Sequence, residues 1–280
     1  MYFTKIRLTG LFTTDLPIVN ALPSDRYILK NADGLGPPEV DVIIADTVNA
    51  GGVYQSRRTQ SRELVITIGL NPDYNVGQTP ADLRTELYGL LTPSQEDKVT
   101  VTIMDGDTPL ANTEGYTKRI EIVPFNKEPE VQVTIACLQQ YLLAPANLYI
   151  IPGGSPGVMP PTGVEIPFDI TNAGTATTGF YMEIVITSPQ PQFYIADSFG
   201  HKMYITNYFY HGDTLILDTR PGFRGIRYKE SGSSTESNII HSLSSDSTWL
   251  MLYGGVNNFI ASSYFFSWGN VFYRPQYWGI

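Results

Sequence analysis

The chain of 280 residues is long enough for two domains, each with a core of its own. Charged residues make up 16% of it, well below the usual share of roughly 25%, and 25 Gly, 20 Pro and 18 Tyr accompany them. This composition favours a β-rich assembly protein over a helical enzyme. The net charge of −9 argues against a nucleic-acid partner, because such a partner needs a basic surface.

The single cysteine, Cys137, excludes a disulfide within the chain and a cysteine-rich zinc site. It lies in an apolar run, so we expect it to be a small buried hydrophobic residue. The first eight residues alternate like a strand and contain no apolar core of a signal peptide. The uncharged stretch between Asp246 and Arg274 contains Gly, Asn and Ser throughout, so we expect no membrane insertion.

In the first half, short strands are expected between Asp-Gly and Pro turns, at residues 5–8, 27–30 and 39–46. A further strand is predicted at residues 64–70. Between the last two strands lies a polar segment, residues 51–62, that we predict to be a long projecting loop. It contains the densest positive cluster of this acidic chain. The residues that we assign to a subunit-interface loop are Gly51, Gly52, Tyr54, Arg57, Arg58 and Arg62.

Two interpretations of this loop are open. It is either a mobile, solvated loop or an arm that crosses to a neighbouring subunit. In the second case its guanidinium groups would pair with carboxylates of that subunit, where charge-assisted hydrogen bonds are strong.

One helix is predicted, over residues 79–92. Thr79 is a good N-cap, Pro80 suits the first helical position, and Asp82 completes a capping box. Four leucines form a single apolar stripe, and Pro93 ends the helix. The stripe consists of Leu83, Leu87, Leu90 and Leu91. Since strands surround this helix, we expect it to cover a sheet.

Strands at residues 98–104, 116–123 and 131–135 complete the predicted N-terminal domain, residues 1–150. The fold class is all-β with one short covering helix, and this domain is either a β-sandwich or a curled sheet. Residues 151–163, rich in Pro and Gly, are predicted to be a linker.

Residues 164–280 form the predicted C-terminal domain, which contains most of the aromatic residues. Its closely spaced strands, without helical periodicity, predict an antiparallel sandwich or jelly roll. Strands are expected at residues 164–170, 177–187, 192–196, 202–206, 214–218, 225–228, 249–253, 258–261 and 269–273. The aromatic residues have two interpretations, a sandwich core or an exposed platform for sugar rings.

No motif predicts catalysis, a metal or a cofactor. Residues 153–157 match Gly-x-Ser-x-Gly, but Pro160 and Pro161 follow where that motif needs a helix. The three histidines have no metal-ligand spacing. Residues 105–107 (Asp-Gly-Asp) are too short for a calcium loop and predict a hairpin turn.

Four segments of the C-terminal half occur in an order that resembles a known family. They are residues 172–177 (Asn-Ala-Gly-Thr-Ala-Thr), 212–218 (Gly-Asp-Thr-Leu-Ile-Leu-Asp), 249–257 (Trp-Leu-Met-Leu-Tyr-Gly-Gly-Val-Asn) and 273–280 (Tyr-Arg-Pro-Gln-Tyr-Trp-Gly-Ile). Together they resemble the distal tail protein (Dit) family of long non-contractile tailed phages. The strand, loop, strand and helix of residues 39–91 extend the resemblance into the first half. One departure is Tyr253-Gly254-Gly255, where the family more often has a proline-glycine turn.

The resemblance implies a non-enzymatic structural protein of the virion, at the tail tip. Family members form a ring, a hexamer, that joins the tail tube protein to the tail hub or tail-fibre protein. The N-terminal domain would make the ring, partly through an extended belt loop, and the C-terminal domain would be a galectin-like sandwich that supports host attachment. The loop of residues 51–62 corresponds to the belt loop.

Two alternatives stay open, a carbohydrate-binding adhesin that recognises a host surface glycan and a hydrolase with a scattered acid pair. Trp268-Gly269 resembles part of the Trp-Gly-x-Glu element of galectins, which makes Trp268 the candidate sugar platform. Val271 stands in place of the acidic residue, so we expect Trp268 to serve packing and the domain to lack galactoside affinity. The oligomeric state would discriminate between a ring-forming tail protein and a monomeric adhesin.

Overall fold

The computed structural model describes residues 3–18, 25–46, 51–91, 98–122, 128–150, 165–262 and 266–280. The chain divides into an N-terminal unit, Met1–Pro145 with Tyr277–Ile280, and a C-terminal unit, Ala146–Gln276. The last four residues therefore belong to the N-terminal unit, whereas the sequence-based division placed them in the second domain. The predicted linker, residues 151–163, lies outside the described residues.

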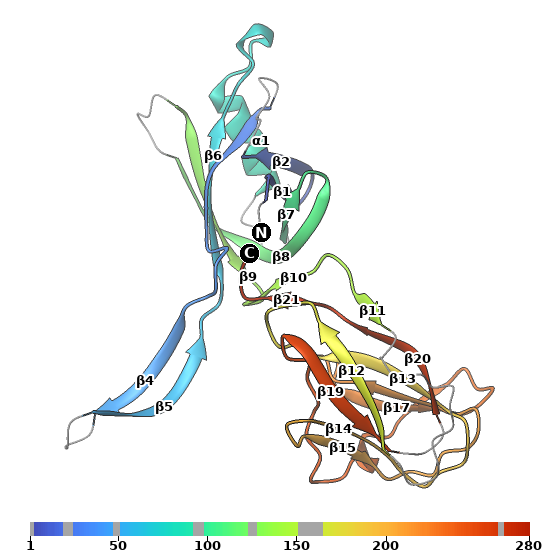
Figure 1. Ribbon diagram of the computed structural model, residues 1–280. Coiled ribbons are helices and arrows are strands. Elements are labelled where there is room, and N and C mark those ends of the chain that lie inside the picture. The colour runs from blue at the N-terminus through green and yellow to red at the C-terminus, as the bar shows by residue number, and fades with distance from the viewer. Residues whose placement is uncertain are drawn as a thin grey trace. The chain divides into compact units, whose positions relative to one another are not determined.

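The N-terminal unit is built on one curled antiparallel sheet with the strand order β2-β1-β7-β8-β9-β6-β3 (Figure 1). Its strands are β1 (Lys5–Thr9), β2 (Thr13–Pro17), β3 (Tyr27–Asp33), β6 (Glu63–Leu70), β7 (Val99–Asp105), β8 (Thr108–Ile122) and β9 (Glu130–Cys137). Two short strands, β10 (Leu142–Leu143) and β21 (Gln276–Tyr277), pair with each other, and β10 also pairs with β8. Of the two architectures that the sequence left open, the curled sheet is the one observed.

Strand alternation supplies the core of this unit. In β7, Val99, Val101 and Ile103 are buried and the threonines between them are half-buried. In β9 the buried positions likewise alternate with half-buried ones, and Cys137 lies buried and free at its end. Residues two apart on a strand point to the same face, so each strand presents one apolar side to the core.

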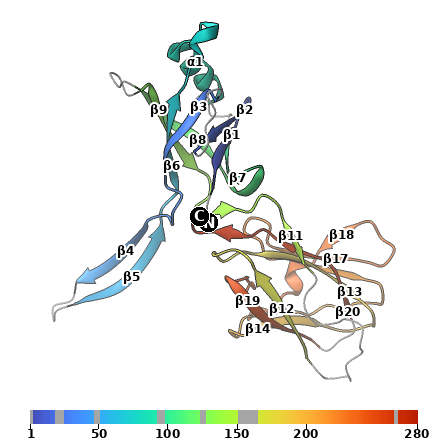
Figure 2. The same cartoon turned by 45° about the horizontal axis from the view of Figure 1, so that its top comes forward.

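The predicted helix is α1 (Pro80–Leu90), preceded by a short 3-10 helix, η1 (Tyr74–Val76). The capping box is present: the Asp82 amide donates to Thr79 Oγ1 at 3.3 Å, and the Thr79 amide donates to Asp82 Oδ2 at 2.9 Å. Leu83, Leu87 and Leu90 are buried in the same core cluster as the strands, so α1 covers the sheet as expected (Figure 2).

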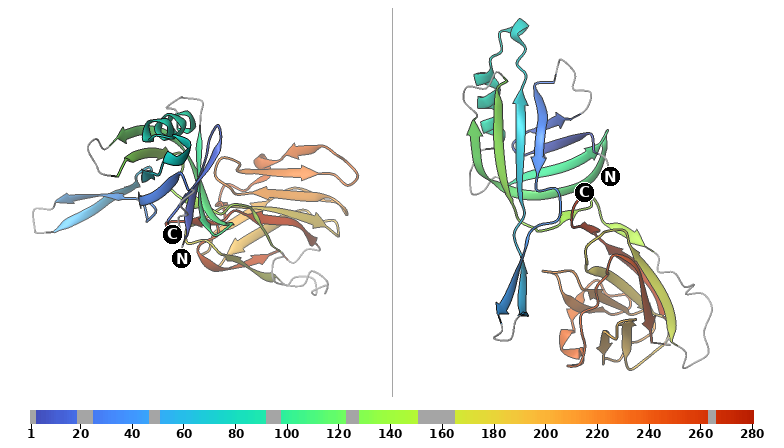
Figure 3. Two further views of the ribbon diagram at one scale, coloured as in Figure 1. Left: turned by 90° about the horizontal axis from the view of Figure 1, so that it is seen from above. Right: turned by 60° about the vertical axis from the view of Figure 1, so that its left-hand side comes forward.

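The C-terminal unit is a sandwich of two antiparallel sheets around one core (Figure 3). The six-stranded sheet has the order β11-β20-β13-β16-β17-β18 and the four-stranded sheet the order β12-β19-β14-β15. The strands are β11 (Leu148–Ile150), β12 (Ile166–Asn172), β13 (Phe180–Ile186), β14 (Phe193–Asp197), β15 (Lys202–Ile205), β16 (Thr214–Asp218), β17 (Gly225–Lys229), β18 (Glu236–Asn238), β19 (Gly255–Ala261) and β20 (Phe266–Tyr273), with a 3-10 helix, η2 (Ile240–Ser242). The all-β fold class is thereby confirmed.

Buried amides explain two of the segments that resemble the tail-protein family. Asn172 donates to the carbonyl oxygens of Ala176 and Leu252, at 3.0 and 3.1 Å. Asn257 donates to the carbonyl oxygens of Tyr253 and Gly255, at 2.8 and 2.9 Å. These buried side chains tie together backbone of the segments between the strands, which accounts for Asn at both positions.

Two sequence predictions of secondary structure are wrong. Residues 51–62, predicted as a loop, contain the strand β5 (Gly52–Thr59). Residues 249–253, predicted as a strand, form only an isolated bridge between Leu252 and Thr178. Short strands such as β2, β11 and β18 were not predicted, since strands of three to five residues have too few positions to show alternation.

Candidate assembly surface

The segment predicted as an interface loop is one half of a two-stranded antiparallel hairpin, which we call the arm. It consists of β4 (Val40–Asp46) and β5 (Gly52–Thr59), which pair with each other and with no third strand among the described residues (Figure 1). A two-stranded hairpin is only marginally stable in water by itself, and both of its edges offer unpaired backbone groups.

The arm exposes apolar side chains over its whole described length. More than half of the surface of Val42, Ile43, Ile44, Val53 and Tyr54 is accessible, and Val40 is exposed as well. By the register, Val42 lies opposite Arg57 and Ile44 lies opposite Tyr54, so these four share one face. A contiguous exposed apolar surface of this kind is typical of a protein interaction site.

Backbone conformation and lack of space explain why two glycines lie near the tip of the arm. Gly51 has φ +109°, a backbone conformation that side-chain-bearing residues rarely adopt. At Gly52 an added Cβ would lie 2.1 Å from Ile44 Cγ2. Larger residues at either position would disturb the strand pairing at the tip.

Arg57 and Arg58 lie on opposite faces of the arm and are exposed. Arg57 pairs in register with Val42, and Arg58 with Asp41. Asp41 itself accepts a hydrogen bond from Gln60 Nε2 at 2.9 Å. Among the described residues neither arginine has an ion-pair partner, so both guanidinium groups are available for a partner's carboxylates.

Arg62 differs from these two arginines, because it is buried at the root of the arm with 2% of its surface accessible. All five of its N–H groups have acceptors, and every acceptor is a backbone carbonyl. Nη1 donates to Gly34 and, at 2.8 Å, to Gly36. Nε and Nη2 donate to Gln140 at 3.2 and 3.1 Å, and Nη2 also donates to Trp278 at 2.6 Å. The structure thus places Arg62 inside the N-terminal unit and not on an exposed interface.

The acceptors of Arg62 come from three separate segments. Gly34 and Gly36 lead from β3 into the arm, Gln140 follows β9, and Trp278 belongs to the returning residues 277–280. We call this group the root of the arm. The Trp278 ring packs edge-on against Tyr141 at 4.7 Å, and the Ile280 amide donates to the Leu35 carbonyl at 3.2 Å.

Burial lowers the pKa of Arg62, because the guanidinium has exchanged water for a low-dielectric surrounding. A guanidinium stays charged at any ordinary pH even so. The five hydrogen bonds compensate for its desolvation, and together they join the two ends of the arm to the rest of the unit.

A sequence signal for this difference exists. In β6, Leu64, Ile66 and Ile68 are buried, and the same alternation extended backwards by two residues reaches Arg62. The polar run of residues 51–62 obscured that signal. Arg57 and Arg58 belong to a strand with no buried face, where alternation says nothing.

The candidate sugar platform, Trp268, packs against the sandwich core. Its ring lies 4.7 Å from that of Phe168 and 4.8 Å from that of Phe266. In the register it pairs with Ile184, a core residue, so it is on the inner side of the six-stranded sheet. This placement fits the packing role expected from the sequence.

The other motifs considered in the sequence form no metal site in the described part of the chain. His201 Nδ1 lies 2.7 Å from Asp197 Oδ2, and His211 Nδ1 lies 2.8 Å from the Thr187 carbonyl. The described residues include no group of three His, Cys, Asp or Glu that would hold a metal. Residues 153–157 lie outside them. No helix in the described ranges is long and apolar enough to cross a membrane.

One family model matches most of the C-terminal unit. Residues 173–277 match the family model SPP1_Dit, described as "Siphovirus-type tail component, C-terminal domain". The C-terminal unit is therefore of the kind found in siphovirus tail components. No curated protein matches the chain.

One solved structure extends the similarity of fold to the N-terminal unit. The chain is similar to "SPP1 Dit (gp 19.1) Protein, a Paradigm of Hub Adsorption Apparatus in Gram-positive Infecting Phages", with a TM-score of 0.63 and 15% identity over 97% of this chain and 98% of that one. A chain of the phage P2 baseplate in its activated conformation with Ca is matched at a TM-score of 0.38 and 10% identity, over 92% and 97% of the two chains. The resemblance to the distal tail protein family is confirmed, and it supports a structural role in a phage tail.

Proposed function

We propose that this chain assembles with copies of itself into a closed ring, a hexamer, at the tip of a phage tail. The ring joins the tail tube protein to the tail hub or tail-fibre protein and supports the parts that attach to the host. The N-terminal unit forms the ring, and the arm acts as the belt between neighbouring subunits. The galectin-like C-terminal unit projects from the ring.

The observation that carries this proposal is the exposed arm. Ile44 and Tyr54 expose 58% of their surface each, on a hairpin that contributes no described strand to the curled sheet. Burying such side chains against a neighbour contributes about 1.5–3 kcal/mol per large apolar residue. A second copy of the chain would provide a surface on which the arm can be buried. Closed rings arise when one surface patch of a subunit binds a different patch of the next copy.

The charge distribution supports the same assignment. Arg57 and Arg58 have no described ion-pair partner, and the chain carries 27 acidic against 18 basic residues. A copy of this acidic chain therefore offers carboxylates to the arm. Charge-assisted hydrogen bonds would then fix the orientation of the arm on the neighbouring subunit.

Native mass spectrometry and negative-stain imaging of the purified chain test the ring directly. We expect six copies in a closed ring at high protein concentration. The paired variant Val42→Asp/Ile44→Asp, which charges the apolar face of the arm, should remain folded and monomeric. A wild-type chain that stays monomeric at high concentration and low salt would contradict a ring formed by this chain alone.

The alternative, a glycan-binding adhesin, would need a platform other than Trp268, because that ring packs on the sandwich core. A monomeric chain with glycan affinity would favour the adhesin over the ring.

A further inference from the structure

The outer face of the six-stranded sheet carries a row of aromatic rings that crosses the strands. In β13, Phe180, Met182 and Ile184 are buried, so Tyr181 and Glu183 between them face away from the core. The pairing register places Tyr149, Phe272 and Tyr181 side by side on β11, β20 and β13. Asp218 of β16 follows Tyr181 in the same row.

The rings of this row are in contact and partly open to solvent. Tyr181 and Phe272 stack with centroids 4.6 Å apart and planes at 18°, and Tyr149 lies 5.2 Å from Phe272. At the far end of the row, Phe223 follows Arg220. Tyr149 and Phe223 expose 68% and 69% of their surface. Exposed rings of this size offer apolar area whose burial by a ligand would be favourable.

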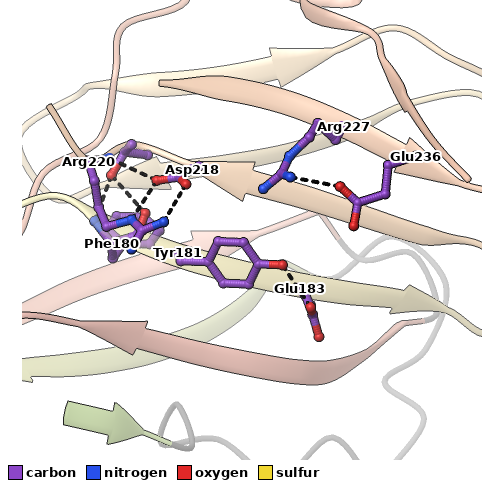
Figure 4. Close-up of polar contacts among 8 residues, drawn as sticks. Phe180, Tyr181, Glu183, Asp218, Arg220, Arg227 and Glu236 are labelled. Carbon is purple, nitrogen blue, oxygen red and sulfur yellow. Dashed lines mark hydrogen bonds and ion pairs between the residues drawn. The ribbon is translucent and has the colours of Figure 1, made fainter. Parts of the chain in front are cut away.

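Arg220 completes the row as a flat, fixed group. Its guanidinium lies 5.0 Å from the Phe272 ring centroid, 5.1 Å from that of Phe223 and 5.6 Å from that of Tyr181. Two parallel hydrogen bonds to Asp218, of 2.9 and 2.7 Å, hold it in place (Figure 4). The bidentate pair fixes its plane before any ligand arrives.

Polar groups lie next to the aromatic row on the same face of the sheet, two residues away along the strands. Glu183 accepts from the Tyr181 hydroxyl at 2.7 Å and from Asn270 Nδ2 at 2.8 Å. Arg227 donates to Glu236 at 2.7 Å, and Figure 4 shows this pair on the same side of the sheet as Tyr181 and Glu183. Each of these side chains is held by a partner, so little rotamer entropy is lost when it binds a further group.

The pairing of the charges decides which ligand fits. The face holds three cationic side chains, Arg220, Arg227 and, two residues further along β17, Lys229. Three carboxylates, of Asp218, Glu183 and Glu236, balance them, so the face has no net positive charge to attract an anionic ligand. A purely apolar partner surface would desolvate these groups without pairing them, which is unfavourable. A sugar ring has an apolar C–H face for the aromatic rings and hydroxyl groups for the carboxylates, amide and guanidinium groups.

We propose that this aromatic row, Tyr149, Phe272, Tyr181, Arg220 and Phe223, with its adjoining polar groups, binds a neutral glycan of gluco-configured pyranose rings. Equatorial hydroxyls leave both faces of such a ring flat and apolar, which suits stacking on successive aromatic side chains. The site goes beyond the ring-forming role, and every residue of it belongs to the C-terminal unit.

Titration calorimetry of the full chain with cellohexaose and with chitohexaose tests the proposal. We expect saturable binding of at least one of these glycans with a sub-millimolar Kd. Tyr149→Ala and Phe223→Ala should each weaken it about tenfold, because each removes an aromatic ring on which a sugar ring stacks. Both side chains are exposed, so the variants should fold.

Tyr210→Ala is the matched control, since Tyr210 is 60% exposed in the same unit and lies outside the row. Its affinity should equal that of the wild type. The proposal is overturned if neither glycan binds, if Tyr210→Ala weakens binding as much as Tyr149→Ala, or if anionic polygalacturonate binds more tightly than both neutral probes. A Tyr149→Ala variant that loses ring assembly while no glycan binds to the wild type would show a subunit contact instead.

Discussion

Arg62 Nη2 donates a hydrogen bond of 2.6 Å to the carbonyl oxygen of Trp278, a residue 216 positions further along the chain. Through the same guanidinium the segment that enters the arm, at Gly34 and Gly36, is joined to the segment that leaves it. One buried side chain therefore joins both ends of the arm to residues 277–280.

Replacing Arg62 with Ala should destabilise the N-terminal unit by about 3 kcal/mol or more, because four buried carbonyl groups lose their donors. Lys at this position should also destabilise, since an ammonium group has only three donors. Urea denaturation monitors the loss. Arg57→Ala is the control and should change the free energy of unfolding by less than about 0.5 kcal/mol. Equal midpoints for both variants would refute the role given to Arg62.

Ending the chain at Gln276 should destabilise the N-terminal unit and leave the C-terminal unit unchanged. The deletion removes the Trp278 carbonyl, the Ile280 amide that donates to Leu35, and the packing of Tyr277 and Ile280 on the core. Trp278→Ala is a milder companion, because it keeps the carbonyl acceptor and loses the ring contact with Tyr141. Hydrogen exchange resolved by segment would locate the loss. Weakened protection in β13 or β16 would contradict the assignment of these residues to the N-terminal unit.

Replacing Arg57 and Arg58 together with Ala should weaken ring assembly about tenfold or more while the melting curve of the monomer stays unchanged. At an interface the truncation would leave the partner's carboxylates buried and unpaired. Sedimentation velocity at several concentrations measures the change. Arg84→Ala/Lys98→Ala removes two positive charges outside the arm and should leave assembly intact. An equal loss in this control would indicate a general charge effect and not the arm.

Asp15 should contribute to the acid sensitivity of the N-terminal unit. The Arg7 side chain, bonded to it at 2.6 and 2.9 Å, lowers the pKa of this carboxyl group, and Lys5 adds to the effect. Because the folded pKa lies below the unfolded value of roughly 3.9, the stabilisation is complete above that value and is lost as the pH falls through the folded pKa. About a third of the side chain is exposed, so solvent screening limits the contribution to less than about 1 kcal/mol.

Asp15→Asn should therefore lower the stability at pH 7 slightly and flatten its decline below pH 4. Denaturant midpoints between pH 2 and pH 7 measure this slope, with Asp105→Asn as the control carboxylate. A variant whose acid slope is as steep as that of the wild type would rule out this contribution of Asp15.

The sequence predicted those elements whose formation depends on residues close together in the chain. Thr79 and Asp82 cap α1 through neighbouring atoms, and the alternation in β7 and β9 reflects one buried face, so both could be recognised in the sequence. The arm could not be recognised as a hairpin, because no face of β5 is buried and its residues show no alternation. The role of Arg62 depends on acceptors as far away as Trp278, and only the folded chain brings these together.

Replacing Trp268 distinguishes a packing role from a sugar-binding role. Loss of a packed ring should lower stability, whereas loss of a sugar platform should abolish binding. Its ring contacts Phe168 and Phe266 at 4.7 and 4.8 Å, so Trp268→Ala would open a cavity beside the sandwich core. We expect a loss of about 3 kcal/mol or more in the stability of the C-terminal unit, as is typical for truncating a packed aromatic residue. We also expect no lactose binding by the wild type, since Val271 stands where a galactoside site needs a carboxylate. Tyr253→Ala, at an exposed aromatic side chain of the same unit, is the control for stability and should unfold close to the wild type. Thermal denaturation and lactose titration of the full chain separate the two roles. Saturable lactose binding that Trp268→Ala abolishes in a chain that is still folded would make Trp268 a ligand-binding residue.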